Sequence, residues 1–260
     1  MDCTGEIMIL LLDLGNTNLY IGVHNDKTLI SEYRTYSDLE KTSDMWCELI
    51  NTYLANAKIS IEDINGAILS SVIPSLTLVI KSAIERLIKK PCLVLSKQIK
   101  SGLAIRIDNP SELGTDLIAD SIGAIKKYGA PLIICDLGTA NKLLVIDKNE
   151  AFVGCTISPG LKQGQKALSN GCAQLMDTSL IAPQKVIGKN SLDSINSGAI
   201  YGTKCMIEGM SKLIEDELGY KTTHILTGGN AELIKDCLDD YIYDPHIVLD
   251  GLYHIYKRNS

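Results

Sequence analysis

The chain has 260 residues, of which 45% are apolar and 22% are charged, with a formal net charge of −6. This composition is typical of a folded globular protein and excludes extensive disorder. The longest basic clusters are lysine pairs such as Lys89-Lys90, so nucleic acid is not an expected partner. The length suits one large domain or two domains of about half the chain each.

Eight cysteines are spread through apolar stretches, with neither a CxxC pair nor a histidine at metal-ligand spacing. We therefore expect reduced core thiols. The apolar run from Ile7 to Leu12 is too short to cross a bilayer, and no basic start or small-residue cleavage site precedes it. These features favour a cytoplasmic protein with no membrane partner.

The first third of the chain predicts three strands joined by short turns, at residues 7–13, 19–24 and 29–36. Such short connections favour antiparallel pairing. Helices and strands then alternate, with a helix at 43–57, a strand at 67–72, a helix at 76–88 and a strand at 92–95. Three hairpin strands followed by alternating helices and strands are typical of a ribonuclease-H-like domain.

The next segment, from Asp108 to Asp116, leads into a helix that runs to about Tyr128. In this helix Asp116 and Asp120 are four residues apart and share a face. After Gly129 the strand pattern restarts, at residues 132–135, 142–147 and 151–157. We therefore predict an α/β protein with two domains related by internal duplication, residues 1–128 and 129–260.

The second half continues with a helix that begins at Ser158-Pro159-Gly160 and runs through Leu168, and with a long helix after Ser191. The long helix carries several glycines and serines that allow close packing against a neighbour. A strand at 224–226, a glycine turn and a helix at 232–238 follow. The tail, residues 247–256, is assigned no element.

One phrase occurs twice, nearly half the chain apart: Asp13-Leu14-Gly15-Asn16-Thr17-Asn18 and Asp136-Leu137-Gly138-Thr139-Ala140-Asn141. Each copy lies between two apolar runs, which predicts a buried strand, a glycine turn led by a carboxylate, and a returning strand. Glycine permits close backbone approach, amides and Asn or Thr side chains donate to phosphate oxygens, and Asp can hold a cation. Together with Thr227-Gly228-Gly229, these turns predict a nucleotide clamp.

An isolated Asp-x-Gly turn also forms for purely steric reasons. Its repetition at matching places in two predicted domains favours the nucleotide interpretation. The sequence contains no complete Walker A motif, no Rossmann GxGxxG, no HExxH and no Gly-x-Ser-x-Gly. Nucleotide binding by an actin-like clamp is the interpretation that remains.

In the order of its motifs the chain resembles the type III pantothenate kinases, of the acetate kinase, sugar kinase, Hsp70 and actin superfamily. The motifs are DLGNTN, SSVIPSL, DNPSELGTD, DLGTA, ISPG, IGKNS and TGGNAEL. The resemblance implies an actin-like ATPase fold of two ribonuclease-H-like domains, and a homodimer. It also implies ATP-dependent phosphorylation of pantothenate to 4'-phosphopantothenate, the first step of coenzyme A synthesis.

The resemblance also implies roles for individual residues around ATP. It assigns the first phosphate loop to Asp13, Gly15, Asn16, Thr17 and Asn18, and the second to Asp136, Gly138 and Thr139. Asp13 would face Mg²⁺, and Asp136 would lie at a monovalent cation, K⁺ or NH₄⁺. The positions expected to border the adenosine are Pro159, Gly160, Gly228 and Gly229.

For the acceptor, Asp116 matches the general base that takes the proton from the primary hydroxyl of pantothenate. The alternative is a solvent-facing helix carboxylate with no catalytic role. Gly114 and Ser191 match positions that contact pantothenate.

The chain departs from the family pattern near the acceptor and the second loop. Leu117 replaces an arginine, Ile107 replaces a tyrosine, and Asn141-Lys142 replaces two threonines. Leucine cannot pair with a carboxylate, so two alternatives stay open: phosphorylation of another small hydroxylated acid, and nucleotide binding by a regulator without turnover.

Lys142 allows two interpretations. Its ammonium group could lie near the phosphates and lessen the need for a bound monovalent cation, or it could be a solvated lysine at a strand edge. Arg106 or Lys142 could replace the missing arginine only if the fold brings one of them to the acceptor.

Overall fold

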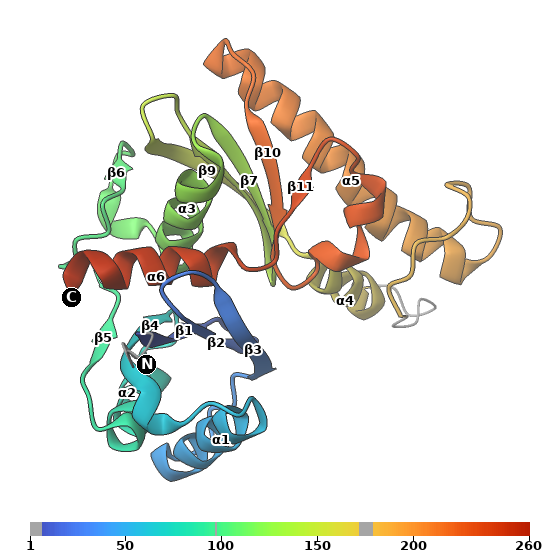
Figure 1. Cartoon of the computed structure of the whole chain (residues 1–260). Helices are drawn as coiled ribbons and strands as arrows, with labels where there is room; N and C mark the ends of the chain where they lie inside the picture. The colour runs from blue at the N-terminus through green and yellow to red at the C-terminus, as the bar shows by residue number, and fades with distance from the viewer. Residues whose placement is uncertain (1–6, 97, 172–178) are drawn as a thin grey trace. The chain divides into compact units, whose positions relative to one another are not determined.

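The computed structural model describes residues 7–96, 98–171 and 179–260 (Figure 1). Contacts between residues divide the chain into two compact units. The first unit comprises Met1–Gly102, Asn109–Gly123 and Ile247–Ser260, and the second comprises Leu103–Asp108 and Ala124–His246. Each unit is therefore assembled from segments that are distant in the sequence.

The first unit is built on a sheet with the strand order β3-β2-β1-β4-β5. Its strands are β1 (Met8–Leu14), β2 (Asn18–His24), β3 (Leu29–Tyr36), β4 (Ile64–Ser71) and β5 (Cys92–Val94). β1, β2 and β3 pair antiparallel, whereas β4 is parallel to both β1 and β5. This combination of a meander with parallel strands confirms the predicted ribonuclease-H-like order.

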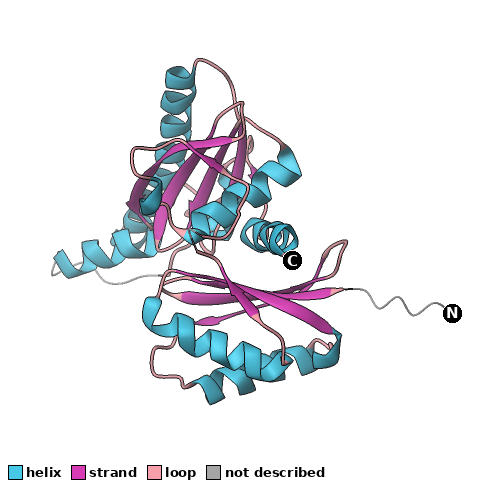
Figure 2. Cartoon of the chain, turned by 90° about the vertical axis from the view of Figure 1, so that its left-hand side faces the viewer, coloured by secondary structure: helices cyan, strands magenta, loops and turns pink. Residues whose placement is uncertain are grey.

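Helices α1 (Ser43–Asn56) and α2 (Pro74–Ile88) pack together on one face of this sheet (Figure 2). Trp46 of α1 and Ile80 of α2 are fully buried in one core cluster with Leu12 of β1. The short 3₁₀ helix η1 (Ile61–Asp63) leads into β4. Because alternate residues of a strand point to opposite faces, β1 also has apolar side chains on its other face.

That other face is covered by α6 (Ile247–Asn259), the last helix of the chain, which packs on β1, β2 and β4. Glycine lets the helix approach the sheet, since a Cβ at Gly22 would lie 2.6 Å from Leu249 Cδ1. The sequence analysis assigned no element to this tail. Its apolar residues Leu249, Leu252 and Ile255 recur every three residues and are fully buried, which was the signal for a helix.

Helix α3 (Thr115–Tyr128) follows the 3₁₀ helix η2 (Pro110–Glu112) and begins in the first unit. It crosses α6 at two glycines. A Cβ at Gly123 would lie 2.1 Å from Ile247 O, and one at Gly251 would lie 1.8 Å from Ala119 O. The two backbones therefore touch at a distance that only glycine permits.

The second unit has a sheet with the strand order β11-β10-β7-β8-β9-β6. Its strands are β6 (Ala104–Ile105), β7 (Leu132–Leu137), β8 (Ala140–Ile146), β9 (Ala151–Pro159), β10 (Thr223–Thr227) and β11 (Ile242–Tyr243). β7, β8 and β9 pair antiparallel, and β10 is parallel to both β7 and β11. The pattern of the first sheet is thus repeated, as the duplicated sequence predicts.

In the second unit α5 (Ser191–Leu218) contributes Ile200 and Ile207 to a core cluster with Ile133 of β7. Helix α4 (Leu161–Gly171) packs against α5. The predicted helix at 232–238 was wrong as a single α-helix. Two 3₁₀ turns, η3 (Ala231–Leu233) and η4 (Lys235–Cys237), replace it, because Ile234 between them has φ −130° and is fully buried.

The segments that make up the two units do not follow the predicted division of the chain after residue 128. β6 pairs with β9 and so joins residues 103–108 to the second unit, whereas α6 returns the C-terminus to the first. Within α3 the division falls between Gly123 and Ala124. Sequence order alone therefore cannot give the composition of either unit.

Six cysteines lie in the described part of the chain and all are free thiols. Cys92 and Cys135 are buried as expected, but Cys155 and Cys205 are exposed, so the expectation of core positions was wrong for those two. Cys3 and Cys172 lie outside the described residues. Among the helices of residues 7–96, 98–171 and 179–260, none is both long and apolar enough to cross a membrane.

Candidate active site

The first Asp-Leu-Gly turn lies between β1 and β2. Its backbone is closed by a hydrogen bond of 2.9 Å from Gly15 N to Asn18 O. Ser37 braces it, donating from its N to Thr17 O at 2.9 Å and from its Oγ to Gly15 O at 2.6 Å. Asn16, Thr17 and Asn18 are exposed. The turn is therefore held by its backbone while the side chains of its tip face solvent.

In the first unit Asp13 and Asp116 are both connected to the same end of β4. On the parallel strand β4, Ser70 is the register partner of Asp13, so the two side chains share one face of the sheet. Ser70 Oγ lies 3.1 Å from Thr115 Oγ1, which donates to Ser71 O at 3.3 Å. Asp116 is the next residue, in the first turn of α3. Both predicted carboxylates thus lie around the C-terminal end of β4.

Gly114 makes room for the Asp116 side chain. A Cβ at Gly114 would lie 2.4 Å from Asp116 Oδ1, so any residue other than glycine would displace this carboxylate. The half-buried Asp116 stands at a helix N-terminus, where a negative charge is stabilised. Asp120 on the same helix face is buried, at 4% exposure. Of the two carboxylates on this face, Asp116 is therefore the one that a substrate could reach.

The residues that depart from the family pattern are placed as follows. Leu117, at 7% exposure, is packed into the first unit as an apolar core residue. Arg106 belongs to the second unit and donates from Nη1 to Asp147 Oδ2 at 3.2 Å. The guanidinium that was considered as a replacement for the missing arginine thus forms an ion pair with Asp147, although its side chain is 58% exposed.

In the second unit, the turn after β7 is packed against the turn after β9. Gly160 N donates to Thr139 O at 3.1 Å, and a Cβ at Gly160 would lie 2.4 Å from Gly138 O. Asn141, at 2% exposure, donates from Nδ2 to Pro159 O at 3.1 Å. Contact this close makes glycine necessary at position 160.

The turn after β10 completes this group. Asn230 donates from its backbone N to Leu137 O and from Nδ2 to Gly138 O, each at 2.8 Å. Gly228 has φ +94°, and a Cβ there would lie 2.4 Å from Asp136 Oδ1. The turns after β7, β9 and β10 therefore meet at one end of the second sheet. Of the three turns in the predicted clamp, this group contains the two at Asp136 and Gly228, and the turn at Asp13 belongs to the first unit.

Sequence reasoning missed Asn141 and Asn230 as residues that fasten these turns together. Both are buried, at 2% and 8% exposure, and both donate an amide hydrogen to a carbonyl of a neighbouring turn. A buried asparagine directly after a glycine turn was the available signal. Gly229, by contrast, is exposed at the tip of its turn.

Asp136 and Lys142 form an ion pair across the β7–β8 hairpin. They are register partners, and Nζ of Lys142 lies 2.7 Å from Asp136 Oδ2. Their side chains are only 17% (Lys142) and 14% (Asp136) exposed. The interpretation of Lys142 as a solvated strand-edge lysine is therefore wrong, because β8 is an interior strand of its sheet.

Ser191 lies at the N-terminus of α5, which is capped by Asn190 Oδ1 accepting from Asp193 N at 2.8 Å. Ser191 is exposed and lines a cavity of about 580 Å³ in the second unit, together with Leu168, Gly188, Lys189, Asn190, Ser194 and Ile195. Gly114 belongs to the first unit. The two positions that were predicted to contact the acceptor are thus supplied by different units.

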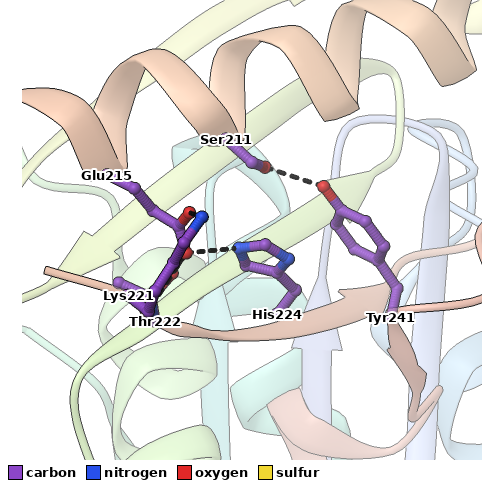
Figure 3. Close-up of polar contacts among 6 residues, drawn as sticks. All are labelled: Ser211, Glu215, Lys221, Thr222, His224 and Tyr241. Atoms are coloured by element: carbon purple, nitrogen blue, oxygen red, sulfur yellow. Dashed lines mark hydrogen bonds and ion pairs between the residues drawn. The ribbon is translucent and has the colours of Figure 1, made fainter.

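A second polar cluster of this unit lies at the opposite end of β10 from Gly228 (Figure 3). Glu215 accepts from Lys221 Nζ at 2.7 Å, from Thr222 N at 2.9 Å and from His224 Nε2 at 3.2 Å. Burial by itself raises the pKa of Glu215, but these partners outweigh it and lower the pKa to about 2. This satisfied carboxylate fastens the C-terminal part of α5 to β10.

The repeated sheets, each with an Asp-Leu-Gly hairpin, have the fold of the actin-like ATPases and sugar kinases. A protein of the Baf transcriptional activator family from Campylobacter jejuni has a similar fold, with TM-score 0.61, 19% identity, and coverage of 96% of this chain and 98% of that one. The activator of 2-hydroxyisocaproyl-CoA dehydratase from Clostridium difficile with bound ADPNP has a similar fold with TM-score 0.57 and 10% identity. The match covers 97% of this chain and 96% of that one. These similarities concern the fold alone.

The sequence profile of the type III pantothenate kinases matches residues 9–213. The type III pantothenate kinase of Exiguobacterium sibiricum is 37% identical over 254 residues, covering 97% of this chain and 100% of the relative. The chain belongs to the type III pantothenate kinase family. It is thus an enzyme of the class that transfers a phosphoryl group to an alcohol, and the resemblance drawn from its motifs is confirmed.

Proposed function

We propose that the chain transfers the γ-phosphoryl group of ATP to the primary hydroxyl of pantothenate. The proposed residues are Asp13 and Asp116 in the first unit and the turns after β7, β9 and β10 in the second. The observation that carries the proposal is the placement of Asp13 and Asp116 around the end of β4 in one unit. Phosphoryl transfer requires alignment and charge stabilisation more than covalent chemistry. A carboxylate for the metal and a carboxylate for the acceptor hydroxyl supply the two charged groups that it needs.

Asp13 is the proposed Mg²⁺ residue. The described residues contain no group of three or more His, Cys, Asp or Glu side chains able to hold a metal on their own. Such a cage is not needed here, because Mg²⁺ in kinases is bound by one or two carboxylates together with water and the substrate phosphates. Asp13, at a strand end beside the exposed tip formed by Asn16, Thr17 and Asn18, fits this requirement.

Asp116 is the proposed general base. Its role would be to accept the proton of the acceptor hydroxyl while that oxygen attacks the γ-phosphorus in line. Gly114 has no Cβ that would displace the carboxylate. It would also border the acceptor in the first unit. Ser191, on the wall of its cavity, is the second position that the resemblance assigns to the acceptor.

The second unit would bind the rest of ATP. Backbone amides at Gly138 and Thr139 would meet phosphate oxygens, and the turns at Pro159-Gly160 and Gly228-Gly229 would border the adenosine. Their close packing supports this proposal, because turns held rigidly in contact offer preorganised donors. The resemblance also implies a monovalent cation at Asp136, which the ion pair with Lys142 calls into question.

A second candidate is phosphorylation of another small hydroxylated compound by the same groups. The burial of Leu117 and the ion pair of Arg106 with Asp147 favour it, since neither residue supplies a cation for an acceptor carboxylate. If the carboxylate has lost its partner, a neutral amide of pantothenate should be an acceptor of comparable quality.

An assay of ADP release with pantothenate, a pantothenamide and unrelated hydroxy acids tests both candidates. We expect turnover with pantothenate, and kcat/KM for the pantothenamide within about tenfold of it, since no ion pair with the carboxylate is lost. Turnover with another hydroxy acid alone would favour the second candidate. Nucleotide binding without turnover on any acceptor would contradict both and indicate a regulator.

We also propose a homodimer located in the cytoplasm. Exposed apolar side chains of the second unit support association: Ile181, Val186, Ile187, Leu192 and Leu213. The free thiols of the described cysteines support a reducing compartment. Light scattering coupled to gel filtration would give the oligomeric state, and a monomer at micromolar concentration would contradict the dimer.

A further inference from the structure

We propose that the ammonium group of Lys142 is the built-in cation of the second hairpin, so that nucleotide binding by this chain does not require a monovalent metal ion at Asp136. The proposal deepens the proposed function, on which its activity readout rests. Its structural basis is the ion pair between Lys142 and Asp136.

The Asp136 carboxylate is enclosed by the chain itself. Lys142 Nζ lies 2.7 Å from Oδ2. On the other side, the Cα hydrogens of Gly228 face Oδ1, since a Cβ there would lie only 2.4 Å from this oxygen. With 14% of the side chain exposed, little of the carboxylate remains open to solvent. A K⁺ or NH₄⁺ ion, which the family resemblance would place at Asp136, therefore does not fit beside this carboxylate while Lys142 is paired with it.

The first hairpin has a different residue at the matching position of its ladder. Across its ladder the residue opposite Asp13 is Tyr20, whose ring stacks under Arg34 with the guanidinium carbon 3.8 Å from the ring centroid. The turn there comprises Gly15 to Thr17, whereas only Gly138 and Thr139 separate β7 from β8. The shorter turn brings Lys142 into register with Asp136.

Charge explains why a cation is needed at this place. Asp136 lies near the end of β7, just before the turn proposed to meet phosphate oxygens, so a bare carboxylate would repel the polyphosphate. A cation next to the carboxylate removes this repulsion. Lysine supplies it from the chain, and a tethered group does not have to be recruited from solution. Ammonium is also the chemical counterpart of the lysine head group, which makes NH₄⁺ the matching probe.

The test measures binding of the Mg²⁺ complex of AMPPNP by calorimetry, in potassium chloride and in tetramethylammonium chloride at equal ionic strength. For the unmodified chain we expect dissociation constants that agree within about twofold. For Lys142→Met we expect roughly tenfold weaker binding in tetramethylammonium, with recovery in K⁺ or NH₄⁺, because a half-buried carboxylate is left without its ammonium. Lys142→Arg keeps the charge and should remain indifferent to potassium.

Lys221→Met is the matched control. Lys221 also pairs with a carboxylate of the second unit at 2.7 Å, that of Glu215, but it precedes β10 and lies at the opposite end of that strand from Gly228. Its loss should not make nucleotide binding dependent on potassium. Thermal unfolding of Lys142→Met without nucleotide gives a second readout: K⁺ or NH₄⁺ should stabilise this variant and not the unmodified chain.

Two binding patterns would overturn this proposal while leaving the proposed function intact. One is nucleotide binding by the unmodified chain that improves tenfold or more with potassium, a measurement that needs no variant to fold. The other is a folded Lys142→Met that binds equally well in both salts. If the binding pattern is as expected but pantothenate is not phosphorylated, the proposed function fails and this inference stands. Absence of nucleotide binding by the unmodified chain would contradict both.

Discussion

The hairpin of Asp13 and the hairpin of Asp136 share a topology and differ in their surroundings. Each ends a buried strand in a sheet of the same order, and each leads a glycine turn. The tip of the first turn faces solvent. The second turn is packed against Gly160 and Asn230, and its carboxylate is paired with Lys142. Duplication has therefore preserved the fold while the two turns have acquired different neighbours.

The difference indicates a division of tasks. An exposed turn beside Asp13, with Asp116 nearby in the same unit, is suited to a metal, a transferable phosphoryl group and an acceptor that come and go. A packed turn with an internal ion pair is suited to a nucleotide held in one orientation. Two changes test this division, and a third tests the carboxylate cluster at the other end of β10. They follow in order of decreasing expected effect.

Asp116→Asn should have the largest effect, and it concerns the first unit only. An amide cannot accept the hydroxyl proton, so we expect kcat to fall by roughly 10²–10⁴-fold while the affinity for nucleotide stays within about twofold. Single-turnover rates and calorimetry measure the two quantities. Asp63→Asn, at an exposed carboxylate of η1 in the same unit, is the control. A rate for Asp116→Asn close to that of the control would remove Asp116 from the mechanism.

Gly228→Ala should affect the second unit alone. Its φ of +94° costs an L residue about 1–2 kcal/mol, and the added Cβ would in addition collide with Asp136 Oδ1 at 2.4 Å. We expect a loss of unfolding free energy of more than about 2 kcal/mol and weakened nucleotide binding. Gly219→Ala is matched in backbone, with φ +75°, but nothing lies within 4 Å of its Cβ.

The glycine control should therefore lose only about 1 kcal/mol and keep its nucleotide affinity. Urea unfolding and calorimetry give both values. A Cβ at Gly228 would also lie 2.6 Å from the backbone N of Leu137, so equal stability losses for Gly228→Ala and Gly219→Ala would mean that neither the Asp136 side chain nor the Leu137 backbone is held rigidly. The comparison between a packed and an open turn would then fail.

Glu215→Gln should have the smallest effect, on stability only. Because the pKa of Glu215 in the folded protein, about 2, is below its ordinary value of 4.5, Glu215 stabilises the fold fully above pH 4.5 and loses this contribution as the pH falls toward 2. We expect Glu215→Gln to lower the unfolding free energy by about 1–3 kcal/mol at pH 7 and by much less at pH 3. Asp216→Asn, at the exposed neighbour, should change neither value. A pH-independent difference would contradict the pKa.

The order of strands could be predicted from the sequence because it depends on local periodicity and short turns. Leu10, Leu12 and the apolar run from Leu132 show this pattern without reference to the rest of the chain. The Asp-Leu-Gly turns and Asp116 could be singled out because their motifs are contiguous. The return of α6 to the first sheet could not, because Gly22 and Leu249 meet from opposite ends of the sequence.

The pair of Asp136 and Lys142 marks the limit of sequence reasoning at the site. The two residues face each other because Gly138 and Thr139 alone form the turn. If the turn took up one more residue of the same sequence, the register would shift by one and Lys142 would lie on the other face of the sheet. The contacts of Asn230 depend likewise on the meeting of β7 and β10, which are far apart in sequence. Register and long-range pairing decide these contacts, and neither is local.

The division between the two hairpins is tested most directly by a crystal structure of the chain with AMPPNP, Mn²⁺ and Tl⁺, which report divalent and monovalent sites by anomalous scattering. The account predicts a manganese peak at Asp13 and the ammonium group of Lys142 at Asp136, with no thallium peak there. A thallium peak at Asp136 with the Lys142 side chain turned away would contradict it.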